Sequence, residues 1–104
     1  MAGDISIRAA TGADQPIISA MVSEAKLDPT SLNWPQFMVA EQEGQVIGIG
    51  QIRPHRDGPE LGSLVVLPEW RGQGIAARLI EALLARQPGV VYLECANHMA
   101  ENYT

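Results

Sequence analysis

The most constraining feature of the sequence is an apolar run, a turn bracketed by two glycines and an amphipathic stretch, in that order, within residues 61–86. The run at 61–67 is short and β-branched near its end, which predicts a buried strand bounded by Pro68. Apolar residues then recur at helical spacing, which predicts a helix with one apolar stripe: Ala76, Leu79, Ile80, Leu83 and Leu84. Pro88 and Gly89 are expected to end this helix.

The turn between this strand and this helix has the features of an anion site. The first turn of a helix has free backbone N–H groups and the positive end of the peptide dipoles. Gly72 and Gly74 lack a Cβ, so a phosphate can approach the backbone closely, and Arg71 adds a permanent positive charge. The order of strand, arginine, glycines and helix favours phosphate binding over an ordinary tight turn.

A dinucleotide-binding fragment is one alternative. Gly72, Gly74 and Ala77 satisfy that fingerprint, and Glu94 follows about twenty residues later, where such folds keep a ribose-binding acid. Residues 68–71 nevertheless separate the strand from the first glycine, and the fingerprint normally opens a domain, so we expect the match to be accidental. A Walker A loop is excluded because the sequence has no Gly-Lys-Ser/Thr.

The composition fits one globular domain of 104 residues, of which 46% are hydrophobic. A net charge of −5 argues against a nucleic-acid partner, which needs clustered Lys and Arg. The single cysteine excludes an internal disulfide, and no apolar run approaches the roughly 20 residues that span a membrane. We therefore expect a cytoplasmic protein without nucleic-acid or membrane partners.

The segment VLPEWRGQGIA at 66–76 resembles the acetyl-CoA signature of the GNAT family of N-acetyltransferases, in which Arg or Gln is followed by x-x-Gly-x-Gly or Ala. Arg71, Gly74 and Ala76 fill those places. The resemblance extends to the preceding strand, to Pro68 and Trp70, and to the following helix. With the flanking elements it covers nearly the whole chain.

Those flanking elements follow from local patterns. We expect a strand at 5–8, a helix capped by Thr11 or Asp14 over 15–25, and a loop at 27–35. A hairpin at 37–42 and 45–53 turns at Glu43 and Gly44. Gly48 and Gly50 predict a bulge or a close contact on the backbone of its second strand.

A fifth strand at 90–95 and the start of another helix at 96–104 are expected to complete the chain. This order resembles the GNAT fold, an α/β (α+β) architecture with a mixed, mostly antiparallel sheet and helices on both faces. The family continues with two further strands. We therefore expect a single domain over 1–104 that lacks them, and an exposed edge at 90–95 that favours self-association.

The resemblance implies that acetyl-CoA is the donor and that a small-molecule or peptide amine attacks it directly, without a metal. A CoA-binding or regulatory module without turnover is the alternative. The family resemblance also implies the residues that contact the donor. They are the backbone of Leu64, Val65 and Val66, the turn and helix start at Arg71, Gly72, Gln73, Gly74, Ile75, Ala76 and Ala77, and the side chain of Asn97.

Direct transfer needs a base for the ammonium proton, a donor for the oxyanion and an acid for the departing thiolate. The resemblance offers two glutamates as the base, Glu60 before the central strand and Glu94 at the end of the fifth. Nearby apolar residues raise the pKa of a carboxyl, as a base requires, but one of the two must be an ordinary solvated carboxylate. Tyr103 is implied as the acid, since a tyrosine with a pKa of about 10 keeps its proton at pH 7.

Three further side chains have both a functional and a structural interpretation. Trp34 either faces the acceptor or covers the core. His55 is a candidate base because histidine side chains titrate near neutral pH, although a solvated loop histidine is the preferred interpretation. Cys95 is a possible nucleophile, although a lone cysteine in an apolar strand is usually buried filler.

Overall fold

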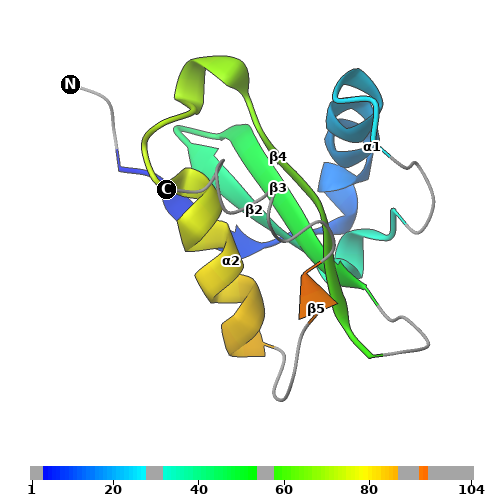
Figure 1. Ribbon diagram of the computed structural model, residues 1–104. Helices are drawn as coiled ribbons and strands as arrows, with labels where there is room; N and C mark the ends of the chain where they lie inside the picture. The colour runs from blue at the N-terminus through cyan, green and yellow to red at the C-terminus, as the bar shows by residue number, and fades with distance from the viewer. Residues whose placement is uncertain (1–3, 28–31, 54–57, 87–91, 94–104) are drawn as a thin grey trace.

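The computed structural model describes residues 4–27, 32–53, 58–86 and 92–93. Five strands form one sheet in the order β1-β2-β3-β4-β5, antiparallel throughout except that β5 runs parallel to β4 (Figure 1). The elements are β1 (Ser6–Ala9), η1 (Gly12–Asp14), α1 (Gln15–Glu24), η2 (Trp34–Gln36), β2 (Phe37–Gln42), β3 (Gln45–Arg53), β4 (Glu60–Val66), η3 (Pro68–Trp70), α2 (Ile75–Arg86) and β5 (Tyr92–Leu93), where η marks a short 3-10 helix.

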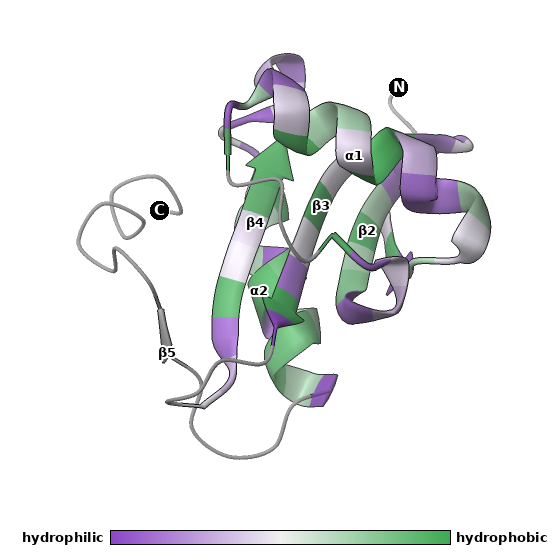
Figure 2. Ribbon diagram, turned by 90° about the vertical axis from the view of Figure 1, so that its right-hand side faces the viewer, coloured by the Kyte–Doolittle hydropathy of each residue, from purple (hydrophilic) through white to green (hydrophobic). Residues whose placement is uncertain are grey.

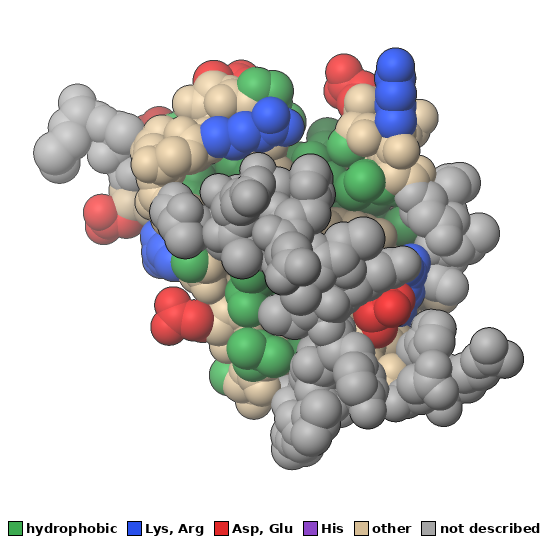
Figure 3. Space-filling model, in the orientation of Figure 1, with side chains coloured by type: hydrophobic (Ala, Val, Ile, Leu, Met, Phe, Trp, Pro, Cys, Tyr) green, Lys and Arg blue, Asp and Glu red, His purple; other side chains and the backbone are tan. Residues whose placement is uncertain are grey.

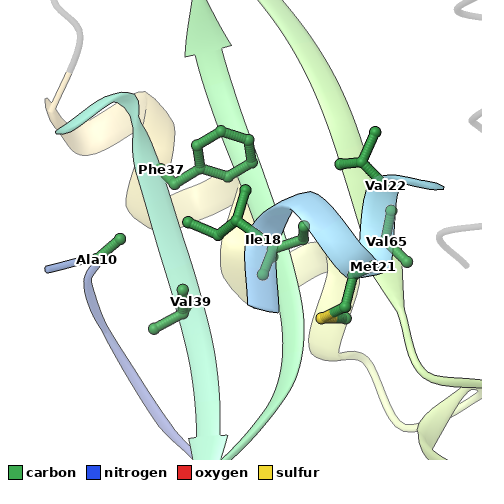
Figure 4. Packing of buried hydrophobic residues seen from close by; sticks show 8 residues of the cluster. Ala10, Ile18, Met21, Val22, Phe37, Val39 and Val65 are labelled. Atoms are coloured by element: carbon green, nitrogen blue, oxygen red, sulfur yellow. The ribbon is translucent and has the colours of Figure 1, made fainter. Parts of the chain in front are cut away.

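Helices α1 and α2 cover opposite faces of the sheet (Figures 1 and 2). Neighbouring side chains of a strand point to opposite faces, and β2 accordingly contributes to two separate cores. Phe37 and Val39 pack with Ile18, Met21 and Val22 of α1 (Figure 4). In the second core, Met38 and Ala40 pack with Ile75, Leu79 and Leu83 of α2. The mixed, mostly antiparallel sheet with helices on both faces is therefore confirmed.

An ionic cluster ties β1 to the start of α1. Arg8 donates to both carboxylate oxygens of Asp14, at 2.8 and 3.1 Å, and to Glu41 of β2 at 2.9 Å. Asp14 is buried and also accepts from the backbone N–H of Thr11 at 2.7 Å. The hydrogen bond from Arg8 is the largest cause of a lowered pKa at Asp14. Thr11 and Asp14 are the N-caps of η1 and α1, but the Asp14 carboxylate makes no cap bond to α1.

The hairpin between β2 and β3 turns where the sequence predicts it. Glu43 and Gly44 have φ of 49° and 84°, and a two-residue hairpin of this kind needs positive φ at both positions. Further along β3, a Cβ built on Gly48 would lie 3.2 Å from Leu79 Cδ1 and 3.3 Å from Ile75 Cγ2. The absence of a side chain there lets α2 lie close to the sheet, as the glycine predicted.

Some predicted boundaries shift or lie outside the described residues. The sequence predicts the central strand at 61–67, whereas β4 starts and ends one residue earlier, at Glu60 and Val66. Of the strand predicted at 90–95, the structure describes Tyr92–Leu93, and the helix predicted at 96–104 lies outside the described residues. Among the described helices, none has the length and apolar character to cross a membrane.

Candidate functional site

The segment that joins β4 to α2 is folded back on the end of the strand. Leu67 N–H extends the pairing with β3 by donating to Ile47 O at 2.9 Å. The short helix η3 (Pro68–Trp70) then leads from the strand into the glycine turn. Arg71 Nε donates to Val66 O at 3.0 Å, which holds this exposed side chain at the point where β4 ends. Figure 3 shows atoms of Lys or Arg at the surface near this turn.

Both glycines of the turn have a backbone conformation that other residues rarely adopt. Gly72 has φ of 82° and Gly74 has φ of 78°. A Cβ built on either would meet nothing within 4 Å, so the glycines are required by their conformation and leave open space above the loop. A phosphate group fits such a surface because no side chain separates it from the backbone.

The start of α2 is held firmly beneath this loop. Ile75, Leu79 and Leu83 are buried against the sheet, which fixes the axis of the helix relative to β4. Arg78 N–H bonds to Gly74 O at 3.1 Å, so the first helical turn closes on the second glycine. The N–H groups before it have no acceptor within the helix and lie at the positive end of its dipole. The residues present therefore fit the pyrophosphate of a nucleotide.

Immediately before this loop, β4 bulges. Ile49 pairs with Val65 and Gln51 with Gly62, so Gly50 alone faces both Ser63 and Leu64. Ser63 has φ of 50°, the positive value that glycine most often supplies in a bulge. Gly50 thus faces the bulge, but the extra residue lies in β4 and not in the hairpin strand in which the glycines predicted an irregularity. The bulge at Ser63 and Leu64 begins the segment Leu64–Val66, whose backbone the family resemblance assigns to the donor.

Glu60 begins β4 in an ion pair. Its Oε1 accepts from Arg53 Nε at 3.2 Å, and both side chains are largely enclosed, at 14% and 15% exposure. Register pairs Glu60 with Arg53 on one side and with Tyr92 on the other. The glutamate therefore lies three positions before Ser63 in the strand that leads to the bulge, with its charge paired.

Several candidate residues lie outside the described residues. Glu94, Asn97 and Tyr103 are among them, as are His55 and Cys95. Their roles stay predictions. Within the described parts of the chain, no three His, Cys, Asp or Glu side chains gather as ligands for a metal ion.

Trp34 lies against the start of η1. A Cβ built on Gly12 would be 3.7 Å from Trp34 Nε1, and Trp34 is 38% exposed. Gln15 fixes this arrangement by accepting from Trp34 N–H at 3.1 Å and donating to Leu32 O at 2.6 Å. Trp34 is one of the exposed large hydrophobic residues, and its two interpretations, facing the acceptor or covering the core, both stay hypotheses.

A cavity of about 450 Å³ lies at the opposite end of α2 from the glycine loop, beside Gln36 and Arg86. Arg86 donates to Pro35 O at 3.1 Å and to Phe37 O at 3.2 Å. Arg53, which also lines the cavity, is the partner of Glu60. Arg53 and Arg86 therefore both bond to other residues of this chain. The cavity that they line is separate from the glycine loop.

Two features of the site were missed by sequence reasoning. One is the ion pair of Glu60 with Arg53, and the other is a hydrogen bond of 2.9 Å from Gln51 Nε2 to Ser63 Oγ across the bulge. Both join residues of β3 and β4 that are brought together by strand register. The only local signal was Gly50, which marks the irregularity but not its partners.

Three solved structures of proteins complexed with coenzyme A have the same fold. N-acetylglutamate synthase from Neisseria gonorrhoeae, complexed with coenzyme A and N-acetylglutamate, matches 97% of this chain with a TM-score of 0.75 and 22% identity. Rv2747 from Mycobacterium tuberculosis, in complex with CoA, matches 78% with a TM-score of 0.67 and 25% identity. Diaminobutyrate acetyltransferase EctA from Paenibacillus lautus, complexed with its substrate L-2,4-diaminobutyric acid and coenzyme A, matches 79% with a TM-score of 0.66 and 20% identity.

The match covers 28% of the Neisseria chain, 56% of the Mycobacterium chain and 57% of the Paenibacillus chain. Comparison with curated protein sequences finds no significant match. The family model described as "Acetyltransferase (GNAT) domain" matches residues 33–103, which include the bulged strand, the glycine loop and α2. The chain belongs to the GNAT acetyltransferase family.

Proposed function

We propose that this chain transfers the acetyl group of acetyl-CoA to a primary amine, and that the loop and helix start at 71–77 hold the nucleotide end of the donor. The observation that carries the proposal is the geometry of this loop. Gly72 and Gly74 have positive φ under open space, and Arg71 is fastened to the end of β4. Together with the first turn of α2, these groups offer backbone donors and positive charge to a pyrophosphate.

The bulged part of β4 leads directly into this loop. A donor held by its pyrophosphate above Gly72 and Gly74 has its acyl arm free to run back along Leu64–Val66. A bulge leaves backbone groups without their usual partners across the ladder, and such groups can bond to an arm of this kind. Acetyl-CoA supplies the acetyl group as a thioester, whose C–S bond breaks as the amine nitrogen forms the new C–N bond.

The amine must lose a proton before it attacks, and Glu60 and Glu94 stay the two proposals for the base. Glu60 is enclosed and lies on the same strand as the bulge, three residues before Ser63, which supports its choice as a base beside the proposed path of the acyl arm. Its ion pair with Arg53 would have to loosen, or share the carboxylate, for it to accept a proton. Tyr103 is the proposed acid for the departing thiolate, with Asn97 as a further donor contact.

The relatives support the choice of ligand. Coenzyme A is present in each of the three solved structures described above. The Paenibacillus enzyme is complexed with an amine substrate, L-2,4-diaminobutyric acid. We infer from this chemistry that the acceptor of the present chain is a small-molecule or peptide amine. Self-association through residues 90–95 and a cytoplasmic location also stay proposals.

The direct test is the release of free CoA thiol from acetyl-CoA over a panel of small-molecule and peptide amines. Transfer predicts time-dependent release that requires an amine and produces the N-acetylated amine by mass spectrometry. Saturable acetyl-CoA binding without release for any amine would instead indicate a CoA-binding or regulatory module. Tight NAD binding in a parallel titration, with no binding of acetyl-CoA, would favour the dinucleotide interpretation.

A further inference from the structure

The bulge in β4 is fastened by a buried amide. Gln51 Nε2 donates to Ser63 Oγ at 2.9 Å, and Gln51 itself has 0% exposure. Its register partner Phe37 belongs to the α1 core, so the Gln51 side chain lies on the α1 face of the sheet. From there it reaches the one residue of β4 that has positive φ.

Stability alone does not explain this arrangement. Among the described residues, Gln51 Oε1 is buried and has no hydrogen-bond partner. The amide therefore makes its contact with Ser63 through the nitrogen while its oxygen stays without a partner. An apolar side chain of similar size would avoid that cost, and glycine would suit φ of 50° better than serine. Local costs of this kind gather at functional sites.

The conformation of Ser63 sets the course of the backbone that follows. Leu64 is the second bulged residue, and its side chain fills the space above Gly50, where a built Cβ would lie 2.8 Å from Leu64 Cδ1. The strand regains its register with β3 at Val65, opposite Ile49. Rotation at Ser63 would therefore redirect the peptide groups of Leu64–Val66 relative to the glycine loop.

We propose that Gln51 is a positioning residue for the donor: by holding Ser63 in its positive-φ conformation, it orients the backbone of Leu64–Val66 toward the acyl-pantetheine arm. This inference rests on the proposed function, because it needs acetyl-CoA as the ligand. Gln51 makes no contact with the donor itself. Its effect should be confined to the acyl end and should not reach the nucleotide end above Gly72 and Gly74.

The test compares two ligands by calorimetry, acetyl-CoA and its nucleotide end alone, 3′-phosphoadenosine 5′-diphosphate. Gln51→Met removes the amide but keeps a side chain of similar volume. It should weaken the binding of acetyl-CoA about tenfold, the size expected for the loss of one well-placed contact. Binding of the nucleotide probe should stay within about twofold, since its site lies on the loop and α2. A general loss of structure would weaken the binding of both ligands by a similar factor.

Rescue separates positioning from packing. Glycine adopts positive φ without an anchor, so Ser63→Gly in the Gln51→Met background should restore acetyl-CoA affinity to within about threefold of the parent. Gln42→Met is the matched control, because it removes another buried amide, near the hairpin turn. It should leave the ratio of the two affinities unchanged.

Four results would overturn the proposal. In Gln51→Met, these are an equal loss of affinity for both ligands, or no loss of affinity for either. The other two are a selective loss of acetyl-CoA affinity that Ser63→Gly does not restore, and the same selective loss in Gln42→Met. Should Gln51→Met not fold, Ser63→Ala is expected to lose acetyl-CoA affinity selectively, and unchanged affinity in that variant would refute the role. A parent chain that binds the nucleotide probe but not acetyl-CoA, or neither, refutes the proposed function instead.

Discussion

Gly50 of β3 lies directly under Leu64 of β4. A Cβ built on Gly50 would come within 2.8 Å of Leu64 Cδ1 and 3.2 Å of Leu83 Cδ1. The first of these distances is shorter than real Cβ contacts, so the ends of the Leu64 and Leu83 side chains would have to move to admit a Cβ at this position. One glycine thus joins the strand that leads to the donor loop to the helix that follows it.

Gly50→Ala should therefore destabilise the protein by about 1–3 kcal/mol, the usual cost of overpacking a core. Urea unfolding measures this. Gly12→Ala is the control, because its Cβ would meet nothing closer than Trp34 Nε1 at 3.7 Å, an ordinary contact. Adding Leu64→Ala to Gly50→Ala should recover part of the loss, and equal stability of the two alanine variants would show that the contact is relaxed in solution.

The Arg8–Asp14 pair predicts a pH dependence of stability. The hydrogen bond from Arg8 is the first cause of a lowered pKa at Asp14, outweighing burial, which acts in the opposite direction. Because the folded pKa lies below the unfolded one, this contribution to stability is complete above the ordinary pKa of an aspartate, 3.8, and is lost as pH falls through the folded pKa.

Asp14→Asn should lower the free energy of unfolding by about 2 kcal/mol at pH 7, the scale of a hydrogen bond to a charged group. The difference from the parent should shrink as the pH falls below about 4. Glu24→Gln is the control, since it removes one exposed negative charge from the end of the same helix. A difference that is the same at pH 7 and pH 3 would rule out the ion pair as its source.

The choice between the two glutamates predicts that only one substitution removes the base. The true base, changed to glutamine, should lose about 100-fold in rate and flatten the rising acid limb of the pH–rate profile. Glu60→Gln keeps an oxygen that can accept from Arg53, so the strand should remain folded. Glu43→Gln, at the exposed hairpin turn, serves as the control.

Parental rates and profiles in both Glu60→Gln and Glu94→Gln would exclude the pair, leaving His55 or water as the base. A large loss in both would mean that one of them acts through structure. Unfolding curves of the two variants would identify which.

The features that the sequence predicted well are those fixed by local chemistry. The apolar stripe of α2, the positive-φ turn at Glu43 and Gly44, and the glycines before α2 each depend on residues close together in the chain. They are stabilised by the same spacings and conformational preferences that make them recognisable.

Contacts across the sheet could not be predicted in the same way. The Arg53–Glu60 pair and the Gln51–Ser63 hydrogen bond depend on a register that shifts by one residue at the bulge. Gly50 indicates that the strand register shifts nearby, but no residue type in β4 indicates at which position the shift occurs. Ser63 has no preference for positive φ that would mark it in a strand rich in valine and leucine.

The central claim is that the donor binds on the loop at Gly72–Gly74, and calorimetry with acetyl-CoA on three chains tests it most directly. Gly74 and Gly44 have nearly the same φ, 78° and 84°, and open space around a built Cβ, so Gly74→Glu and Gly44→Glu carry the same strain, bulk and charge. The parent and Gly44→Glu should bind acetyl-CoA alike, while Gly74→Glu should show no detectable binding. Binding by Gly74→Glu as tight as that of the parent would contradict the account.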